Sequence, residues 1–163
     1  MRHEYRKLKI WQKSMDLSVL IYKTTGQFPK DEIYALVSQL KRAVVSIPSN
    51  IAEGSGRNTD KEFIQFLFIA YGSSCELDTQ IELSKRLNFI SEEEYNSITS
   101  EINEIQKMIF KLRDKLLSNL EKWYLISHFS NLKNTQKNMQ EAYIVAGYRS
   151  AIGKAKKGGF RFY

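Results

Sequence analysis

Residues 95–116 have the sequence YNSITSEINEIQKMIFKLRDKL, and this stretch decides the expected fold. Its apolar residues recur at alternating steps of three and four: Tyr95, Ile98, Ile102, Ile105, Ile109, Leu112 and Leu116. This spacing places them on one face of an α-helix, as in the seam of a coiled coil. Ser91 and Glu94 form a capping-box pattern just before the stretch. We therefore predict a long amphipathic helix, and Leu120 and Trp123 extend its spacing past Lys115.

Three further helical patterns precede this stretch. The first is expected over about 5–24, and the second begins near Asp31 or Glu32 and stops at the glycines of 54–56. The third begins at a capping box of Thr59 and Glu62. Pro48 lies inside the second pattern and is expected to kink it. Four long helices with short connections predict an all-α, antiparallel up-down four-helix bundle.

Two details of these helices bear on packing. The first helix carries two apolar stripes, one of Ile10, Leu17 and Ile21 and one of Leu8, Trp11, Met15, Val19 and Tyr22. Since a surface helix of a monomer needs a single apolar face, two stripes indicate a helix packed on more than one side. The small residues of 72–75 in the third helix indicate close approach of a neighbouring helix.

The basic charge is concentrated near the C-terminus. The 163 residues carry a net charge of +7, and the length fits one domain with an appendage. Residues 1–117 contain 17 Lys and Arg against 16 Asp and Glu, whereas residues 118–163 contain 8 against 2. We therefore predict a bundle over 1–117 and a basic, aromatic-containing C-terminal extension over 118–163, partly helical with a flexible end from Gly147.

The expected compartment follows from what the sequence lacks. No run of about 20 apolar residues occurs, so neither a membrane span nor a membrane partner is expected. The basic N-terminus is not followed by the apolar segment of a secretory signal. Cys75 is the single cysteine, which excludes an internal disulfide and fits a reducing compartment. The sequence thus favours a cytoplasmic protein.

Basic residues form the candidate binding surface. Arg2, Arg6, Lys9 and Lys13 step by four, three and four, and would share one face if the first helix begins early; Lys7 lies beside them. Lys41 and Arg57 are further candidates. The extension interleaves cations with aromatic rings, the cations being Arg149, Lys154, Lys156, Lys157 and Arg161. Because cations bind phosphates while rings stack on unpaired bases, this pattern favours RNA or single-stranded DNA.

Simpler interpretations of the same residues remain open. The N-terminal cations can form an ordinary solvated face. The tail aromatics can dock on the bundle or on a protein partner, and the basic tail can serve solubility alone.

Signals for catalysis or metal binding are poor. His3 and His128 lie far apart, Cys75 stands among helical core residues, and no phosphate-cradling glycine loop or Glu-x-x-His motif occurs. We expect no enzyme activity, no metal and no cofactor. The polar residues expected to have structural roles are Glu53 and Glu76, hydrogen-bonded in buried or interfacial positions with Arg42 or Asn50.

Several patches together resemble a known family. They are LKIWQK at 8–13, IY at 21–22, FP at 28–29, Glu32, Tyr34 and Leu36, SQLKRA at 38–43, SIPSNIAEGSGR at 46–57, Phe63, Phe66, AYGS at 70–73 and EL at 76–77. Over residues 8–117 the chain resembles the four helix bundle proteins first met in intervening sequences of bacterial 23S ribosomal RNA genes. The most specific patch is 46–57. The resemblance does not cover 118–163.

The resemblance implies a left-handed four-helix bundle that assembles into a ring-like homopentamer and has no known enzyme activity. One branch of the family is similar to the accessory variability determinant of diversity-generating retroelements, a basic pentamer that binds nucleic acid and a reverse transcriptase. We therefore expect a non-enzymatic homopentamer that binds nucleic acid, in which each basic surface recurs once per subunit. The alternative is a protein-interaction scaffold with no direct nucleic-acid role.

Overall fold

The computed structural model describes the backbone of residues 4–156 and the side chains of residues 4–125. The chain divides into two units, Met1–Leu120 and Glu121–Tyr163. The α-helices are α1 (Lys9–Thr24), α2 (Leu36–Ser55), α3 (Asp60–Arg86) and α4 (Glu92–Lys156). Short 3-10 turns lie at Tyr5–Lys7, Thr25–Gln27 and Lys30–Glu32. No strand occurs among residues 4–156, which confirms the predicted all-α class.

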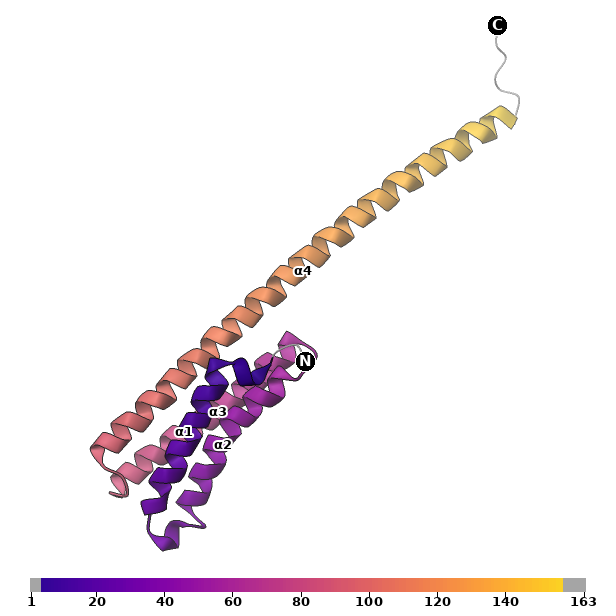
Figure 1. Cartoon of the computed structure of the whole chain (residues 1–163). Helices are drawn as coiled ribbons and strands as arrows, with labels where there is room; N and C mark the ends of the chain where they lie inside the picture. Colours follow the sequence, from indigo (N-terminus) through magenta and orange to yellow (C-terminus); the bar gives the residue numbers. More distant parts are fainter. Residues whose placement is uncertain (1–3, 157–163) are drawn as a thin grey trace. The chain divides into compact units, whose positions relative to one another are not determined.

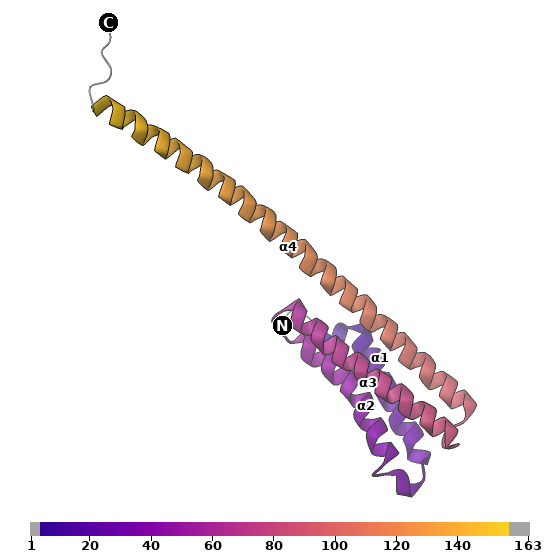
Figure 2. The same cartoon turned by 180° about the vertical axis from the view of Figure 1, so that it is seen from behind.

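The first unit is a four-helix bundle. Figures 1 and 2 show α1, α2, α3 and the first part of α4 lying side by side and running in alternating directions. The connections between them are short, so consecutive helices are antiparallel neighbours. The predicted up-down bundle is confirmed.

The seam of α4 supplies one wall of the bundle core. Ile98, Ile102, Ile105 and Ile109 are each at most 1 % exposed, while Tyr95 and Leu112 are partly buried. They pack in one cluster with apolar residues of the other three helices, such as Leu17, Leu40 and Leu67. Burial of each large aliphatic side chain contributes roughly 1.5–3 kcal/mol before entropy is counted. The periodicity of residues 95–116 thus correctly identified the core-facing side of α4.

The start of α1 differs from the prediction. The helix begins at Lys9, because Leu8 has an extended backbone and separates it from the 3-10 turn Tyr5–Lys7. Of the two apolar stripes, the one with Ile10, Leu17 and Ile21 is buried. The other is partly buried at Leu8 and Trp11, then exposed at Met15, Val19 and Tyr22. In the single chain, therefore, α1 leaves its second stripe open to solvent towards its C-terminal end.

The first turns of α2 and α3 differ in how they are capped. α2 begins at Leu36 rather than near Asp31, because residues 30–32 form a 3-10 turn instead. α3 begins with the predicted capping box: Thr59 Oγ1 accepts from the Glu62 amide at 3.2 Å, and the Glu62 carboxylate accepts from the Thr59 amide at 3.1 Å. These bonds satisfy amide donors that a helix start otherwise leaves unpaired.

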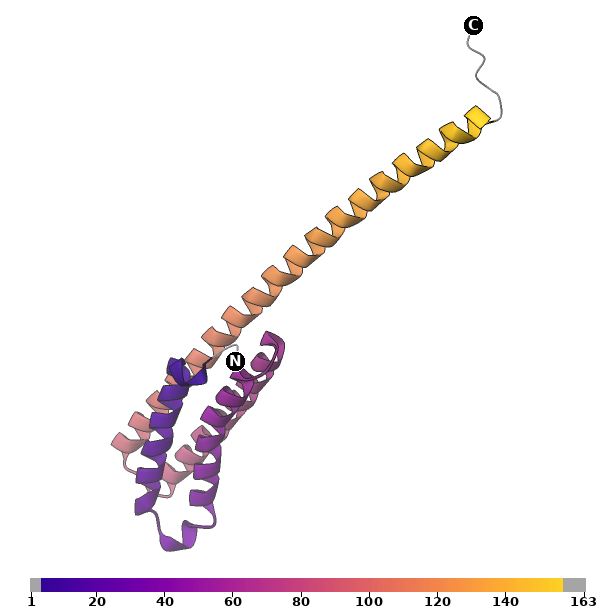
Figure 3. The ribbon, with the colours of Figure 1, turned by 45° about the vertical axis from the view of Figure 1, so that its right-hand side comes forward.

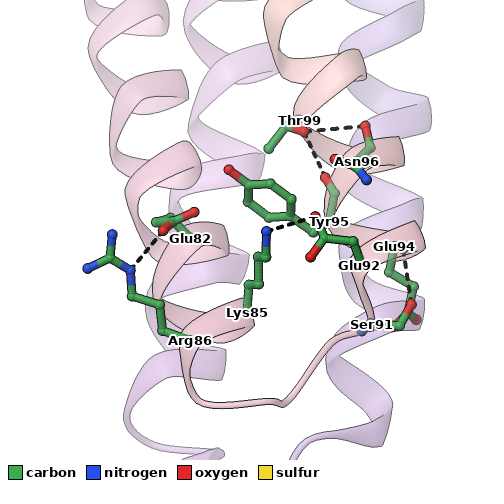
Figure 4. A network of polar contacts seen from close by, with 9 residues as sticks. All are labelled: Glu82, Lys85, Arg86, Ser91, Glu92, Glu94, Tyr95, Asn96 and Thr99. Atoms are coloured by element: carbon green, nitrogen blue, oxygen red, sulfur yellow. Dashed lines mark hydrogen bonds and ion pairs between the residues drawn. The ribbon is translucent and has the colours of Figure 1, made fainter.

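Polar contacts close the turn between α3 and α4, as Figure 4 shows. Lys85 Nζ on α3 lies 2.8 Å from a Glu92 carboxylate oxygen on α4. Ser91 and Glu94 form the predicted reciprocal bonds, with the Glu94 amide donating to Ser91 Oγ at 3.2 Å and the Ser91 amide to the Glu94 carboxylate at 2.9 Å. Asn88 takes the left-handed conformation with φ of 59°, which Asn tolerates better than most residues.

Candidate nucleic-acid interface

The N-terminal cations do not form one continuous helical face. Arg6 and Lys7 belong to the 3-10 turn, whereas Lys9 and Lys13 lie on α1, and the extended Leu8 breaks the helical spacing between them. Lys7 pairs with Glu4 at 2.7 Å, and Arg6 Nε donates to the Tyr5 hydroxyl at 3.3 Å. Arg2 lies outside the described residues. The prediction that Arg6 shares a helical face with Lys9 and Lys13 is therefore wrong, because the helix begins only at Lys9, and the placement of Arg2 stays a prediction.

Lys13 forms ion pairs that link two helices of the bundle. Its ammonium on α1 lies 2.8 Å from a Glu101 oxygen and 2.9 Å from a Glu104 oxygen, both on α4. These two hydrogen bonds, with Glu101 the stronger cause, raise the pKa of Lys13 above its usual value. The side chain is 25 % exposed. Lys13 thus joins two helices and offers little free charge to a polyanion.

The two ion pairs of Lys13 lead to a prediction about the stability of the bundle. Lys13→Met is expected to lower the free energy of unfolding by about 1 kcal/mol, since partly exposed ion pairs contribute about that at most. A raised lysine pKa means that the contribution is fully present below the unfolded value of about 10.4 and is lost as pH rises through the folded pKa. Urea unfolding at neutral pH and above pH 11 or so measures both effects.

The control for this prediction is Lys23→Met. Lys23 is exposed in the last turn of α1 and has no ion pair with a described residue. Its substitution should leave stability nearly unchanged at both pH values. An equal loss in the two variants would show that Lys13 does not tie α1 to α4.

Lys9 has a different environment from Lys13. It is exposed and lines a hollow of about 290 Å³ on the α1–α4 seam, together with Leu8, Ile10, Met108, Lys111, Leu112 and Lys115. The three lysines form no ion pair with any described residue. Lys111 and Lys115 were not among the residues expected from the sequence. Their spacing of four along α4 was visible there, but nothing placed them beside Lys9.

Lys41 and Arg57 are engaged in local contacts. The Lys41 ammonium lies 4.9 Å from the Tyr22 ring centre, at a groove of about 710 Å³ formed mainly by α2 and the residues just before it. Arg57 forms an ion pair with Glu53 and lies 4.7 Å from the Phe66 ring centre. Cation–π contacts and exposed ion pairs are weak, so both cations remain reachable from solvent.

The cations of the C-terminal extension are only partly described. α4 continues to Lys156, further than the glycine- and lysine-rich composition from Gly147 indicated. Arg149, Lys154 and Lys156 lie on this helix, and their side chains are outside the described residues, as are Lys157 and Arg161 altogether. The predicted interleaving of cations and aromatic rings in 147–163 stays a prediction.

The polar residues expected to pair with one another have other partners. Glu53 pairs with Arg57 and is exposed, and Glu76, also exposed, accepts from Gln80 Nε2 at 3.1 Å. The Asn50 amide donates to the Ser46 carbonyl at 2.8 Å and to Ser46 Oγ at 3.0 Å. Neither carboxylate bonds to Arg42 or Asn50, because both side chains point to the surface of a single chain. Arg42 and Glu76 instead line the 710 Å³ groove.

The described residues carry neither a metal cluster nor a membrane span. Within the described side chains, no group of three or more His, Cys, Asp or Glu residues is placed to hold a metal ion. No helix in this part of the chain combines the length and the apolar character needed to cross a bilayer. The lone Cys75 is partly buried, with Gln106 Nε2 at 3.9 Å from its sulfur.

Known proteins share this bundle. A family model described as 23S rRNA-intervening sequence protein matches residues 6–111. The chain is similar to a crystal structure of a protein of unknown function from the S23 ribosomal protein family of Bacteroides thetaiotaomicron, with 28 % identity and a TM-score of 0.58. That match covers 64 % of this chain and 97 % of the other. No curated protein matches the chain significantly.

Proposed function

Because the chain belongs to the 23S rRNA-intervening sequence protein family, we propose that it is a homopentameric helical bundle that binds RNA or single-stranded DNA through basic surfaces and catalyses no reaction. In this role it is a candidate accessory protein of a retroelement reverse transcriptase. Binding depends on phosphate contacts repeated around the assembly, because several weak contacts acting together raise the overall affinity.

The observation that carries the proposal is a set of exposed, unpaired lysines in the bundle, to which the basic extension adds charge. Lys9, Lys107, Lys111 and Lys115 are exposed and have no ion pair with a described residue. The last three are spaced by four on α4 and therefore share one side of that helix. Like charges so close repel one another, and an anionic partner relieves the repulsion. Residues 118–163 add 8 Lys and Arg against 2 Asp and Glu.

Assembly is supported by apolar surface that a single chain leaves open. Met15, Val19 and Tyr22 on α1 are 39 %, 51 % and 49 % exposed. Near Tyr22 the 710 Å³ groove is also lined by Ile33 and Tyr34, and Tyr34 is 94 % exposed. Contiguous exposed apolar surface of this kind marks interaction sites in soluble proteins. A second copy of the chain is the proposed partner for it.

Static light scattering tests the assembly. The expected mass is five times the chain mass of 19.0 kDa, unchanged by nuclease treatment. Val19→Glu should dissociate the pentamer, because a carboxylate buried in an apolar interface costs several kcal/mol. Asn103→Glu, which places the same carboxylate at an exposed position on α4, away from this apolar stripe, should leave it intact. A wild-type mass of one chain would contradict the proposal.

Fluorescence anisotropy with labelled oligouridylate tests nucleic-acid binding. The protein is expected to bind at low salt and to lose at least tenfold in affinity between about 50 and 200 mM salt, because binding a phosphate releases counterions. Lysozyme at equal concentration serves as a control for nonspecific attraction by a basic protein. Absent binding at low salt, or binding insensitive to salt, would contradict the proposal.

One observation favours a second candidate, a protein-interaction scaffold. The 710 Å³ groove combines exposed aromatic and aliphatic side chains with Arg42 and Glu76, a mixture typical of protein interfaces. A pull-down with and without nuclease separates the two candidates. Protein partners that remain after nuclease treatment, together with absent oligonucleotide binding, would favour the scaffold.

A further inference from the structure

We infer that the hollow on the α1–α4 seam binds one unpaired base of a single-stranded nucleic acid while Lys9, Lys111 and Lys115 bind the phosphates beside it. This inference deepens the proposed function, on which it rests, by assigning a site within the bundle. Figures 1 and 3 show the first turn of α1 lying beside α4. The residues that line the hollow come from these two segments.

The floor of the hollow is apolar. Leu8, Met108 and Leu112 are partly buried, and Ile10 is 4 % exposed. The hollow has a volume of about 290 Å³, is shallow and open to solvent, and is lined by seven residues of the α1 start and α4. Such a floor attracts a flat, weakly hydrated group such as a nucleobase and does not bind a hydrated phosphate by itself. A phosphate can therefore contact only the rim.

The rim of the hollow is cationic, because the acidic and the basic residues of α4 lie at different points along its contact with α1. One turn further along α1, Lys13 is neutralised by Glu101 and Glu104 of α4. Towards the start of α1, the facing part of α4 carries Lys111 and Lys115, and no described acidic residue pairs with Lys9. The acidic half of the seam is thus internally paired, and the other half presents positive charge to solvent.

The spacing of the lysines fits a nucleotide backbone. A step of four residues along a helix rises about 6 Å, so Lys107, Lys111 and Lys115 present ammonium groups at nearly regular intervals. This interval is close to the repeat of an extended nucleotide chain. Bases in a duplex are stacked on one another and cannot lay a face on the apolar floor of the hollow without being flipped out, whereas an unpaired base can.

An acidic protein segment fits the same surface less well. A docked amphipathic helix inserts anchors at successive turns and needs a groove several turns long. The hollow spans residues 8–10 of one helix start and 108–115 of α4, which is room for one compact group. The regular cations continue beyond it along α4 to Lys107, where a nucleotide chain can follow them.

The test compares oligothymidylate with an oligomer of the same length that lacks bases, using the full-length protein and anisotropy. The triple variant Lys9→Gln, Lys111→Gln and Lys115→Gln should lose at least tenfold in affinity for oligothymidylate. The slope of log affinity against log salt should fall by about 2, or roughly 0.7 for each phosphate that is no longer neutralised. The matched control is a second triple variant, Lys23→Gln, Lys30→Gln and Lys61→Gln. These three lysines are exposed and have no ion pair with a described residue.

Met108→Gln separates base insertion from charge. Wild-type protein should prefer oligothymidylate to the abasic oligomer several-fold, and Met108→Gln should reduce that preference while leaving the salt slope unchanged. Loss of thermal stability in this variant is checked by circular dichroism; Met108→Leu, which keeps the floor apolar, should retain the preference.

Three results would overturn the inference. The first is a triple variant that binds oligothymidylate as tightly as its control while wild type binds well, in which case nucleic-acid binding stands and lies elsewhere. The second is equal wild-type affinity for the abasic oligomer. The third is loss of binding to a labelled acidic amphipathic peptide in the triple variant with unchanged oligonucleotide affinity, which would assign the hollow to a protein. Absent wild-type binding to any oligonucleotide would contradict the proposed function itself.

Discussion

Replacing Ile105 with aspartate is expected to unfold the bundle. Ile105 is fully buried in the middle of the α4 seam, in the same cluster as core residues of α1, α2 and α3. The aspartate removes aliphatic packing and places a carboxylate among apolar side chains that cannot pair with it. The combined cost is about 4 kcal/mol or more, against a typical total stability of about 5–15 kcal/mol.

Circular dichroism and urea unfolding measure the effect of Ile105→Asp. Asn103→Asp is the matched control, because Asn103 lies on the exposed side of the same helix and receives the same carboxylate. It should unfold within about 0.5 kcal/mol of wild type, as surface substitutions usually do. Ile105→Val, which removes one methylene, should cost only about 0.5–1.5 kcal/mol. A folded Ile105→Asp variant with near wild-type stability would show that the seam does not face the core.

The α4 seam could be predicted because its signal is local and redundant. Its seven apolar positions follow one period, and Ser91 and Glu94 mark the start with residues whose side chains make the expected bonds. The same reasoning located the start of α3 at Thr59. Helix starts with side-chain caps are visible in sequence, because the capping residue and its partner stand three positions apart.

The start of α1 could not be predicted in this way. Its N-cap is Leu8, which has no side-chain acceptor, and the apolar spacing runs through it without interruption. The break is made by the backbone, since Leu8 is extended and the Gln12 side chain donates to the Arg6 carbonyl at 2.9 Å. Placing Arg6 on the same face as Lys9 therefore required a helix that the chain does not form.

The sequence also does not show which cations are free of ion pairs. Lys9 and Lys13 are neighbours on one helix and look equivalent in the sequence. Lys13 is neutralised by two carboxylates about 90 residues away, whereas Lys9 meets Lys111 and Lys115. The pairing of Lys13 and the surroundings of Lys9 both depend on how α4 lies beside α1. Apolar periodicity predicts that the two helices share a core, but not which surface residues of one helix face those of the other. The structure therefore differs most from the sequence prediction at cations whose neighbours come from distant segments of the chain.

The second large expected effect is a loss of stability on substitution of Gly54. The sequence around Gly54 does not show that a side chain there would be destabilising. The glycines of 54–56 suggest a helix stop, yet Gly54 is buried inside α2, which continues to Ser55. A Cβ atom added at Gly54 would lie 2.6 Å from Phe66 Cβ and 2.7 Å from Phe63 Cδ2, both on the first turns of α3. Phe66 Cβ is anchored to its backbone and cannot move aside alone. The absence of a side chain at Gly54 therefore permits α2 and α3 to pack closely beside their turn.

Gly54→Ala is accordingly expected to destabilise the bundle by about 2 kcal/mol, because α3 must shift outwards and overpacking of this kind costs about 1–3 kcal/mol. The loss occurs although alanine favours a helix interior over glycine by about 1 kcal/mol. Gly72→Ala in α3 is the matched control, because nothing lies within 4 Å of a Cβ at Gly72. The close helix contacts of the small residues 72–75 are made by Ser73, 2.8 Å from Ser46 of α2, and by Ser74, 3.1 Å from Gln106 of α4. Gly72→Ala should gain up to about 1 kcal/mol from propensity alone.

Urea unfolding of the two variants under identical conditions distinguishes packing from propensity, because the same substitution in two helices is expected to change stability in opposite directions. If both variants gained stability, helix propensity would dominate at both sites and the close approach of α2 to α3 at Gly54 would be refuted. If both lost stability, Gly72 would have a neighbour that a single chain does not supply, which points to a contact made in the assembly. Opposite signs place the close contact inside the bundle, at the α2–α3 turn.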